Sequence, residues 1–520
     1  MTLPPILSAL GIESASVPER FAVVDVERAS FADLSKRLVE EMGLPLSLMY
    51  ATDERSSSGS YGMYAVFAVD ETQDLLTLRT RVPAEDPHYP SLTVSIMAAH
   101  WYERLIQDQF GIVADGHPDP RRLMHHQNIP AGTFPLRKDF AWNTVLSHAN
   151  EPDPMHVVTG QGVYEIPVGP IHAGVIEPGH FRFHVRGERI LTLEGKLFFT
   201  HKGVEKMLEG KTPIEAMPFV ERVSGDMAVG HSVAFAEAVE RALGVQIPER
   251  ARVLRTILNE WERITAHVFD IGNMGGNGTG FSFMAAQGFR LVERMRRVHQ
   301  DISGHRFLRG VIVPGGLAQD IADEHVKALV AEVGYVEQEM KKILDIAYAS
   351  DGLMERFETT GVLSHAAALA YGALGTPARA SGVGRDLRRD RPFAGYEGLS
   401  VGVVTEKTGD VRARVDVRAR ELKESFRLIR LCFARLTPGP VAVALPAERS
   451  GSAYGWCEAW RGEILDWVRL DDHGRIDRCV IRDPSFCNWA LFGEIGPGNI
   501  VPDFPLCNKS LNLSYSGTDL

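Results

Sequence analysis

Apolar and polar positions alternate in short stretches of the first 145 residues and then give way to longer helical repeats. Residues 61–69 and 75–82 are rich in β-branched and aromatic side chains, so they predict two strands. Residues 92–110 carry apolar side chains at helical spacing and predict an amphipathic helix. A polar, proline-rich connector at residues 130–154 follows, and it predicts a domain boundary.

After the connector the pattern predicts strands first and then long helices. Residues 181–185 alternate between apolar and polar, a Gly187-Glu188 turn follows, and residues 190–199 predict the returning strand. Two apolar stripes at steps of three and four residues predict helices over residues 253–268 and 329–343. Both stripes are interpreted as packed core.

These patterns predict an α+β protein built from two units. The chain has 520 residues, several times a typical domain length. Residues 1–150 are predicted to form an α/β domain, and residues 155–520 a mainly helical domain with a small β region at its start. No window of eighteen residues is uninterruptedly apolar, so we expect any membrane contact to come through partner subunits.

Charge and cysteine content exclude several classes of protein. Lys and Arg number 56 against 67 Asp and Glu, a net charge of −11, and this balance without a long basic run argues against nucleic-acid binding. The five cysteines lie within the last ninety residues and form no CxxC pair. This usage argues against a disulfide framework, a zinc ribbon or a chain-borne iron–sulfur cluster, and it predicts a reducing, cytoplasmic compartment.

The first unit carries an ordered set of motifs. They are Trp-Tyr-Glu-Arg at 101–104, Gly-His-Pro-Asp-Pro-Arg-Arg at 116–122 and Pro-Leu-Arg-Lys-Asp-Phe at 135–140. This unit resembles the small hydrophilic subunit of respiratory complex I, which docks beside the quinone-site subunit.

The second unit carries a different set. It includes Gly-Pro-Ile-His-Ala-Gly-Val-Ile-Glu-Pro-Gly-His at 169–180, His-Lys-Gly-Val-Glu-Lys at 201–206, Glu-Arg-Val-Ser-Gly at 221–225 and Asp-Pro at 483–484. This unit resembles the large subunit of membrane-bound, complex-I-related [NiFe] hydrogenases and, more remotely, the quinone-site subunit of complex I. The fusion is typical of hydrogenase-4-like and formate-hydrogenlyase-like complexes. The resemblance implies a small iron–sulfur subunit and antiporter-like membrane subunits as partners, and a peripheral position on the cytoplasmic face of the inner membrane.

The sequence departs from these hydrogenases at the metal ligands. Two CxxC pairs hold nickel and iron in the family, and the matching positions here are Ser224, Met227, Ser485 and Asn488. Nickel and iron in that site need soft, anionic thiolates, which hydroxyl, thioether and amide groups do not replace. Cys487 lies beside the last position, but one thiolate cannot replace four. We therefore expect no nickel–iron centre, no cofactor bound by this chain and no hydrogen evolution.

Ser224, Met227 and His231 have helical spacing and are predicted to share one face of a helix. The resemblance makes His231 the family's histidine after the first cysteine pair. It either forms a polar wall of a vestigial pocket or is a hydrogen-bonded core residue. Asp226 either replaces part of the lost negative charge or faces solvent.

His172 matches the histidine that lines the quinone headgroup site of complex I, where an imidazole can donate a proton to a reduced quinone. The tyrosine that partners it there has no match in residues 223–226. His172 is therefore either a quinone ligand or a structural turn residue.

Two glutamates match acidic positions of the family. Glu177 matches a glutamate that passes protons away from the metal site, and Glu205 matches a position that binds magnesium in some members. Buried together, the two carboxylates could form a proton relay. Glu205 could equally form a surface ion pair with Lys206. Arginines at 385, 388, 389 and 391 predict a solvated loop or a contact with another subunit.

Three functions remain open from the sequence. The first is an electron-transfer or proton-coupling subunit without a metal centre, the second a scaffold that holds the iron–sulfur subunit on the membrane arm, and the third a quinone-reducing subunit. The resemblance also implies that hydrogenases lose a C-terminal extension once nickel is loaded. Here we expect residues 496–520 to stay attached and to fold, with Phe504, Leu506 and Leu511 as apolar anchors.

Overall fold

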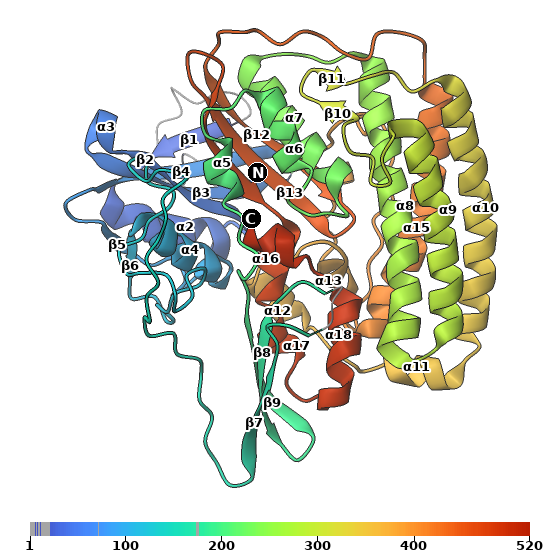
Figure 1. Cartoon of the computed structure of the whole chain (residues 1–520), viewed down its shortest axis with the longest axis horizontal. Coiled ribbons are helices and arrows are strands. Elements are labelled where there is room, and N and C mark those ends of the chain that lie inside the picture. Colours follow the sequence, from blue (N-terminus) through green and yellow to red (C-terminus); the bar gives the residue numbers. More distant parts are fainter. Residues whose placement is uncertain (1–5, 7, 9–10, 12–20, 71, 173–175) are drawn as a thin grey trace.

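A four-stranded sheet forms the centre of the first unit in the computed structural model, which describes residues 6, 8, 11, 21–70, 72–172 and 176–520 (Figure 1). In sheet order the strands are β1 (Phe21–Asp25), β4 (Asp74–Pro83), β3 (Ser60–Val69) and β2 (Leu46–Glu54). The β1–β4 pair is parallel and the other two pairs are antiparallel. The predicted strands at 61–69 and 75–82 are confirmed. The unit also contains η1 (Arg28–Ser30), α2 (Phe31–Glu40), α3 (Arg55–Ser58) and a parallel pair of β5 (His88–Pro90) and β6 (Val113–Asp115).

The predicted helix at 92–110 is shorter than expected. Only η2 (Met97–Ala99) and α4 (His100–Phe110) are helical. The buried Glu103 carboxylate accepts hydrogen bonds from the backbone N–H groups of Leu92 and Thr93 and from the hydroxyl of Ser91. Because these residues fold around a carboxylate, their N–H groups are not available for a helix.

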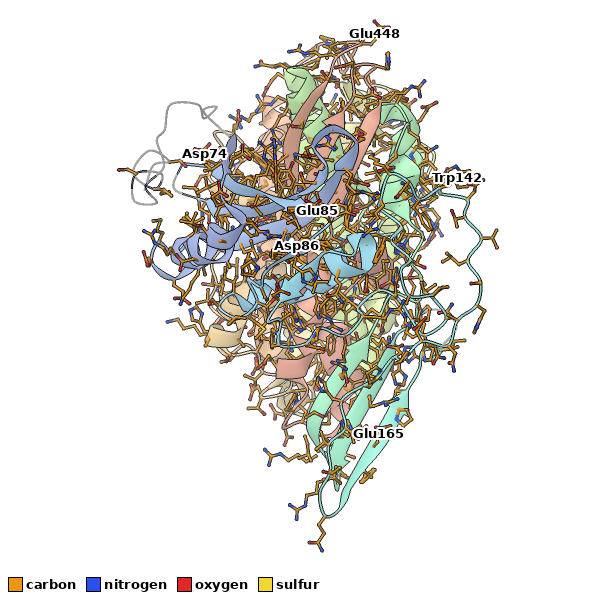
Figure 2. All side chains as sticks on the ribbon, turned by 90° about the vertical axis from the view of Figure 1, so that its left-hand side faces the viewer. Asp74, Glu85, Asp86, Trp142, Glu165 and Glu448 are labelled. Carbon is orange, nitrogen blue, oxygen red and sulfur yellow. The ribbon has the colours of Figure 1, made fainter. Side chains whose placement is uncertain are left out.

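The connector after the first unit has no regular structure. Residues 116–162 contain neither helix nor strand. Figure 2 shows Trp142 at the surface on this connector, where 74% of the residue is exposed. Residues 141–162 are largely exposed, whereas Leu123, Met124 and Leu136 earlier in the segment are buried.

The second unit begins with a three-stranded antiparallel sheet that projects from the molecule (Figure 1). It consists of β7 (Val163–Val168), β8 (His180–Arg186) and β9 (Arg189–Lys196). Four long helices then lie side by side: α8 (Glu249–Thr279), α9 (Ser282–Ser303), α10 (Asp323–Tyr348) and α15 (Val411–Arg435). The strands predicted at 181–185 and 190–199 and the two predicted helices are confirmed.

A second sheet of this unit was absent from the sequence predictions. It consists of β12 (Gly451–Ala459), β13 (Gly462–Leu470) and β14 (Ile476–Arg482). Both faces are covered, by α7 (Ala228–Leu243) and by the first unit, whose Tyr50 hydroxyl lies 3.0 Å from that of Tyr454. Because both faces are buried and carry charged side chains, these strands lack the simple alternation that identifies a half-exposed strand.

Shorter elements complete the second unit. They are α5 (Val204–Leu208), α6 (Pro213–Val220), β10 (Ile312–Val313), β11 (Gly316–Leu317), α11 (Asp351–Phe357), α12 (His365–Ala370), α13 (Gly375–Ala380) and α14 (Leu387–Asp390). At the C-terminal side follow α16 (Pro484–Trp489), α17 (Phe492–Ile495), η3 (Val501–Asp503), α18 (Phe504–Leu511) and α19 (Tyr515–Asp519). Leu506 and Leu511 are buried, and the Phe504 ring lies 4.9 Å from that of Phe181. The expected anchoring of the tail is confirmed.

The packing of α7 on β12 depends on Gly455. A Cβ at this position would lie 2.0 Å from the carbonyl oxygen of Ala234 and 2.4 Å from the backbone nitrogen of Ala238. We predict that Gly455→Ala lowers the free energy of unfolding by about 2–4 kcal/mol, because α7 must move away from the sheet. Denaturant unfolding of the purified protein measures this effect.

The matched control is Gly334→Ala in α10, where an added Cβ would meet nothing within 4 Å. Since alanine favours a helix interior over glycine by about 0.5–1 kcal/mol, the control is expected to be neutral or slightly stabilising. Equal stability of the two variants would contradict the close contact.

Candidate functional site

The four positions that replace the family's metal ligands come together in the interior. Ser224 and Met227 lie in the turn before α7, and Ser485 and Asn488 lie on α16. All four are fully buried. The expected shared helix face with His231 is wrong, because α7 begins only at Ala228. Both carboxylate oxygens of Glu262 accept hydrogen bonds from the first turn of α7, from the N–H groups of Val229 and Gly230, so this turn is fixed from outside the helix.

The side chain of Arg461 enters this site from the turn between β12 and β13. Its Nη1 donates to the Ser224 hydroxyl at 3.3 Å and lies 3.9 Å from the Met227 sulfur. Both Nη atoms donate to Asp226, at 2.6 and 2.9 Å. Burial raises the pKa of Asp226, but the guanidinium outweighs this effect and leaves the pKa below its usual value. Asp226 therefore supplies a negative charge to the site, although 41% of its side chain is exposed.

The C-terminal tail also enters the site. The Ser224 hydroxyl donates to the Ser514 hydroxyl at 3.0 Å, and the Ser514 N–H donates to the Ser485 hydroxyl at 3.0 Å. Arg461 Nε donates to the Asn512 carbonyl at 2.5 Å. The Asn488 amide faces away toward backbone, accepting from the Leu374 N–H and donating to its carbonyl. The polar atoms at these positions are thus paired with protein groups.

His231 forms a buried ion-pair contact with Asp483. Its Nε2 lies 3.0 Å from the carboxylate, and neither side chain is exposed. Asp483 also accepts from the Ser485 N–H at 2.7 Å and so caps α16. Burial raises the pKa of Asp483, but His231 and then Arg461 bring it below its usual value. His231 is therefore a hydrogen-bonded core residue, one of the two alternatives for this position.

Cys487 points toward the first unit. Its sulfur lies 3.4 Å from the Tyr102 hydroxyl on α4. Burial raises the pKa of this thiol, so it is a poor thiolate ligand at neutral pH.

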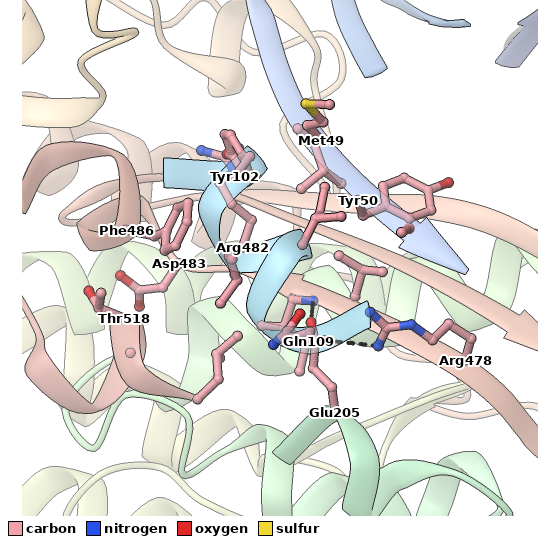
Figure 3. Close-up of a pocket in the computed structure, with 18 residues that line it drawn as sticks. Met49, Tyr50, Tyr102, Gln109, Glu205, Arg478, Arg482, Asp483, Phe486 and Thr518 are labelled. Atoms are coloured by element: carbon pink, nitrogen blue, oxygen red, sulfur yellow. Dashed lines mark hydrogen bonds and ion pairs between the residues drawn. The ribbon is translucent and has the colours of Figure 1, made fainter. Parts of the chain in front are cut away.

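Glu205 lines a cavity of about 30 Å³ between the two units (Figure 3). Its carboxylate accepts from Arg478 at 2.9 Å and from the Ile481 N–H at 3.0 Å. Lys206 instead pairs with Glu209, so the predicted Glu205–Lys206 surface pair is wrong. Because both carboxylate oxygens already face donors, this side chain is not arranged to hold magnesium, and no group of His, Cys, Asp and Glu in the described part of the chain is placed to hold a metal.

His172 and Glu177 lie on the loop between β7 and β8, of which residues 173–175 fall outside the described part. The His172 ring lies 5.9 Å from the Phe181 ring, and its buried Nε2 has no hydrogen-bond partner among the residues that the structure describes. Burial lowers its pKa, and Lys509 and His180 lower it further. Glu177 is exposed, and its carboxylate accepts from the Ser516 N–H at 2.9 Å. The two residues are therefore in different environments.

The arginine loop is not solvated as predicted. Arg388 and Arg391 are each 1% exposed. Arg388 donates to Asp386 at 2.6 Å and to Glu260 of α8 at 3.1 Å. The nearby Arg379, which sequence reasoning missed, pairs with Glu421 and Glu458. The sequence did contain a signal for these buried ion pairs, namely acidic and basic residues within the apolar stripe of α8. A charged residue at a core-facing position needs a buried partner. Arg389, with 47% of its side chain exposed, is the arginine that fits the predicted solvated loop.

Sequence reasoning also missed a cavity of about 80 Å³ beside the former metal site. Asp226, Glu262, Thr265, Arg296 and His299 are its polar lining residues. Burial lowers the pKa of His299 to about 4. Burial also raises the pKa of Glu262 to about 8, an effect that its two backbone hydrogen bonds only partly offset.

Family models match three parts of this architecture. The respiratory-chain NADH dehydrogenase 30 Kd subunit matches residues 24–145, and the 49 Kd subunit matches residues 278–450. Nickel-dependent hydrogenase matches residues 202–271. The fold and the site thus define a fused pair of complex-I-type units with a hydrogenase-like region.

Relatives that match most of the chain identify a family within this class. Formate hydrogenlyase subunit 5 of Escherichia coli strain K12 is 32% identical over 492 residues, covering 91% of this chain and 84% of the relative. Hydrogenase-4 component G of the same organism is 30% identical, covering 91% and 83%. An NADH-quinone oxidoreductase subunit from Methylococcus capsulatus is 26% identical, covering 98% and 95%. The chain belongs to the family of formate hydrogenlyase subunit 5 and hydrogenase-4 component G.

A solved structure agrees with this assignment. A chain of the membrane-bound sulfane sulfur reductase, an archaeal respiratory membrane complex, matches with a TM-score of 0.66 and 25% identity. The match covers 70% of this chain and all of the other chain.

Neutral His299 gives a testable pH dependence. Because its pKa is depressed on folding, the unfolded chain binds a proton that the folded chain does not, and stability falls as the pH drops from about 6.5 toward 4. We predict that His299→Gln removes about 2 kcal/mol of this acid-induced loss between pH 7 and pH 5. Denaturant midpoints at pH 7 and pH 5 measure the difference.

His148→Gln, at an exposed position on the connector, serves as the control and should leave the pH slope unchanged. The prediction fails if both variants lose the same free energy as the unmodified protein between the two pH values.

Proposed function

We propose that this chain is the hydrogenase-like large subunit of a membrane-associated, complex-I-related oxidoreductase, and that it lacks a nickel–iron centre and does not evolve hydrogen. Its role is electron transfer to or from a neighbouring subunit, or proton coupling to that transfer. The observation that carries the proposal is the composition of the former metal site, where Arg461, Asp226 and Ser514 pair with the residues at the ligand positions.

The charges of this site support the proposal. A nickel–iron pair requires anionic ligands, whereas Ser224, Met227, Ser485 and Asn488 are neutral. The guanidinium of Arg461 would oppose a bound cation at the same place, and Asp226 already compensates that guanidinium. The residues present therefore do not fit a nickel–iron centre.

We propose partners and a location that agree with the relatives. Relatives named for hydrogenase-4 and NADH-quinone oxidoreductase, and a solved respiratory membrane complex, support partners within a membrane-bound complex. Within it we propose a small iron–sulfur subunit and antiporter-like membrane subunits as the partners. The described residues contain no helix long and apolar enough to cross a membrane. A peripheral position on the cytoplasmic face of the inner membrane agrees with these findings, and nucleic acid is not proposed as a partner.

Two other functions compete with this proposal. A scaffold that holds the iron–sulfur subunit on the membrane arm would need no chemistry at the site. Quinone reduction is favoured by one specific observation, the buried Nε2 of His172, which has no hydrogen-bond partner in the described ranges of the chain. The similarity to the NADH-quinone oxidoreductase relatives also favours it.

The first test is metal analysis of the complex isolated from its natural membranes. We predict iron from a partner subunit, no stoichiometric nickel, no hydrogen evolution from reduced viologen, and an intact mass of 57.4 kDa for this chain. One nickel per chain together with hydrogen evolution would overturn the proposal. Recovery of the chain without any cluster-binding protein would contradict the proposed partner.

The second test separates quinone reduction from the other functions. We predict that His172→Gln leaves electron transfer by the complex unchanged, because we assign His172 a structural role. A loss of about tenfold or more, with the exposed His148→Gln variant unaffected, would instead favour quinone reduction at this loop.

A further inference from the structure

The cavity beside the former metal site has room for water. Its volume of about 80 Å³ exceeds the roughly 10–15 Å³ that one water needs. It lies against α8 and α9, with Phe307 and Trp460 among its apolar lining residues and Asp226 and Glu262 among its polar ones. Asp226 is partly exposed. Water in this cavity would therefore contact both a buried carboxyl group and a partly exposed one.

Glu262 is held rigidly at the wall of this cavity. It is 7% exposed, and its two oxygens accept from the N–H groups of Val229 at 2.9 Å and Gly230 at 3.1 Å. These N–H groups belong to the first turn of the 16-residue helix α7. Gly230 also permits a close approach, because a Cβ there would lie 2.8 Å from the Ala459 Cβ at the end of β12.

Several charged or titratable groups face Glu262, but none of the cations among the described residues forms an ion pair with it. Asp226 faces it from the turn before α7, and Arg461 faces it from the turn after β12. Arg296 and His299 lie on α9, and the Cys457 thiol lies on β12. Arg461 gives both of its Nη atoms to Asp226. The Arg296 guanidinium lies over the Phe307 ring, 4.8 Å from its centre. In the part of the chain that is described, no ion pair to Glu262 is formed.

Two carboxyl groups and two guanidinium groups thus lie at this edge of a low-dielectric interior, but Arg461 pairs with Asp226, and no ion pair between Arg296 and Glu262 is formed among the described residues. Ionising both carboxyl groups would leave the Glu262 carboxylate buried without an ion pair, which costs several kcal/mol. A bound proton on Glu262 removes this cost. The ionised form of Glu262 also remains accessible, because N–H groups at the N-terminus of a helix stabilise a carboxylate. The site is therefore built for both forms of the side chain.

We propose that this cavity is a proton-binding site, in which Glu262 carries a proton in the resting protein and exchanges it with cavity water. In the exchange the Oε–H bond of Glu262 breaks, the proton passes to a water, and the carboxylate keeps its two backbone hydrogen bonds. Any coupling of this proton exchange to electron transfer rests on the proposed function. The protonation itself does not depend on that function.

Infrared spectroscopy of the isolated complex tests the site directly. A protonated carboxyl group has a C=O stretch distinct from the carboxylate bands, and burial places the titration of Glu262 near pH 8. Other buried carboxyl groups, such as those of Glu458 and Asp466, also have raised pKa values. We therefore expect the difference between the spectra of the unmodified and Glu262→Gln complexes to contain a carboxylic acid band that is present at pH 6 and declines between pH 7 and 9. The matched control Glu249→Gln, at the exposed first residue of the same helix, should keep the band. The decline in the unmodified complex can be measured even if Glu262→Gln fails to assemble.

A second variant tests exchange through the cavity. Ala266 lines the same cavity, so Ala266→Leu should reduce its volume and slow the deuterium shift of the band after transfer to D₂O. Absence of any acid band that titrates in this range, or its persistence in Glu262→Gln, would overturn the proposal. An unchanged exchange rate in Ala266→Leu would overturn the water route. Because none of these readouts measures nickel or electron transfer, they can fail or succeed independently of the proposed function.

Discussion

The ion pair between Arg461 and Asp226 is the interaction on which the centre of this protein depends. From the turn between β12 and β13, Arg461 contacts two segments that are distant in sequence: the turn before α7, through Ser224 and Asp226, and the tail, through the Asn512 carbonyl. A metal centre held by four thiolates would join the same two ligand segments by coordination bonds. Here hydrogen bonds and one ion pair connect them, and the tail becomes part of the connection through Ser514.

Buried charge extends well beyond this pair and constrains the surrounding helices. Arg379 pairs with Glu421 of α15 and with Glu458 of β12, and Arg388 pairs with Glu260 of α8. Removing one member would leave its partner charged and buried, which typically costs about 3–5 kcal/mol. Such pairs fix how the helices and the β12–β14 sheet are oriented, so the cavity beside Glu262 lies in a rigid setting.

The sequence was informative where local pattern decides structure. Strands β3 and β4 and helices α8 and α10 were predictable because apolar side chains repeat at the period of each element. The loss of metal ligands at Ser224 and Asn488 was also readable, since it depends on residue identity alone.

Features that depend on long-range contacts were not predictable. The β12–β14 sheet is covered on both faces, Arg388 finds a partner 128 positions away, and Glu205 pairs with Arg478 rather than with its neighbour. A single sequence gives no measure of such contacts, because burial of a charged residue depends on the partner that the fold brings to it. Glu262 was missed for the same reason, since it lies next to the core stripe of α8 and its partners come from α7.

An ion pair and a protonated acid, as proposed for this position, perform different chemistry from a metal centre. Guanidinium, carboxyl and hydroxyl groups do not take up electrons, so these side chains can contribute to the proposed function only by holding or passing protons. They can still respond to an electron nearby. A negative charge that arrives at this face disfavours the ionised form of Glu262 and raises its affinity for a proton, because like charges oppose ionisation of a carboxyl group. The response is strong only where water does not screen it, and Glu262 is nearly fully buried. A buried acid in this geometry can therefore change its protonation when the charge of a neighbouring group changes.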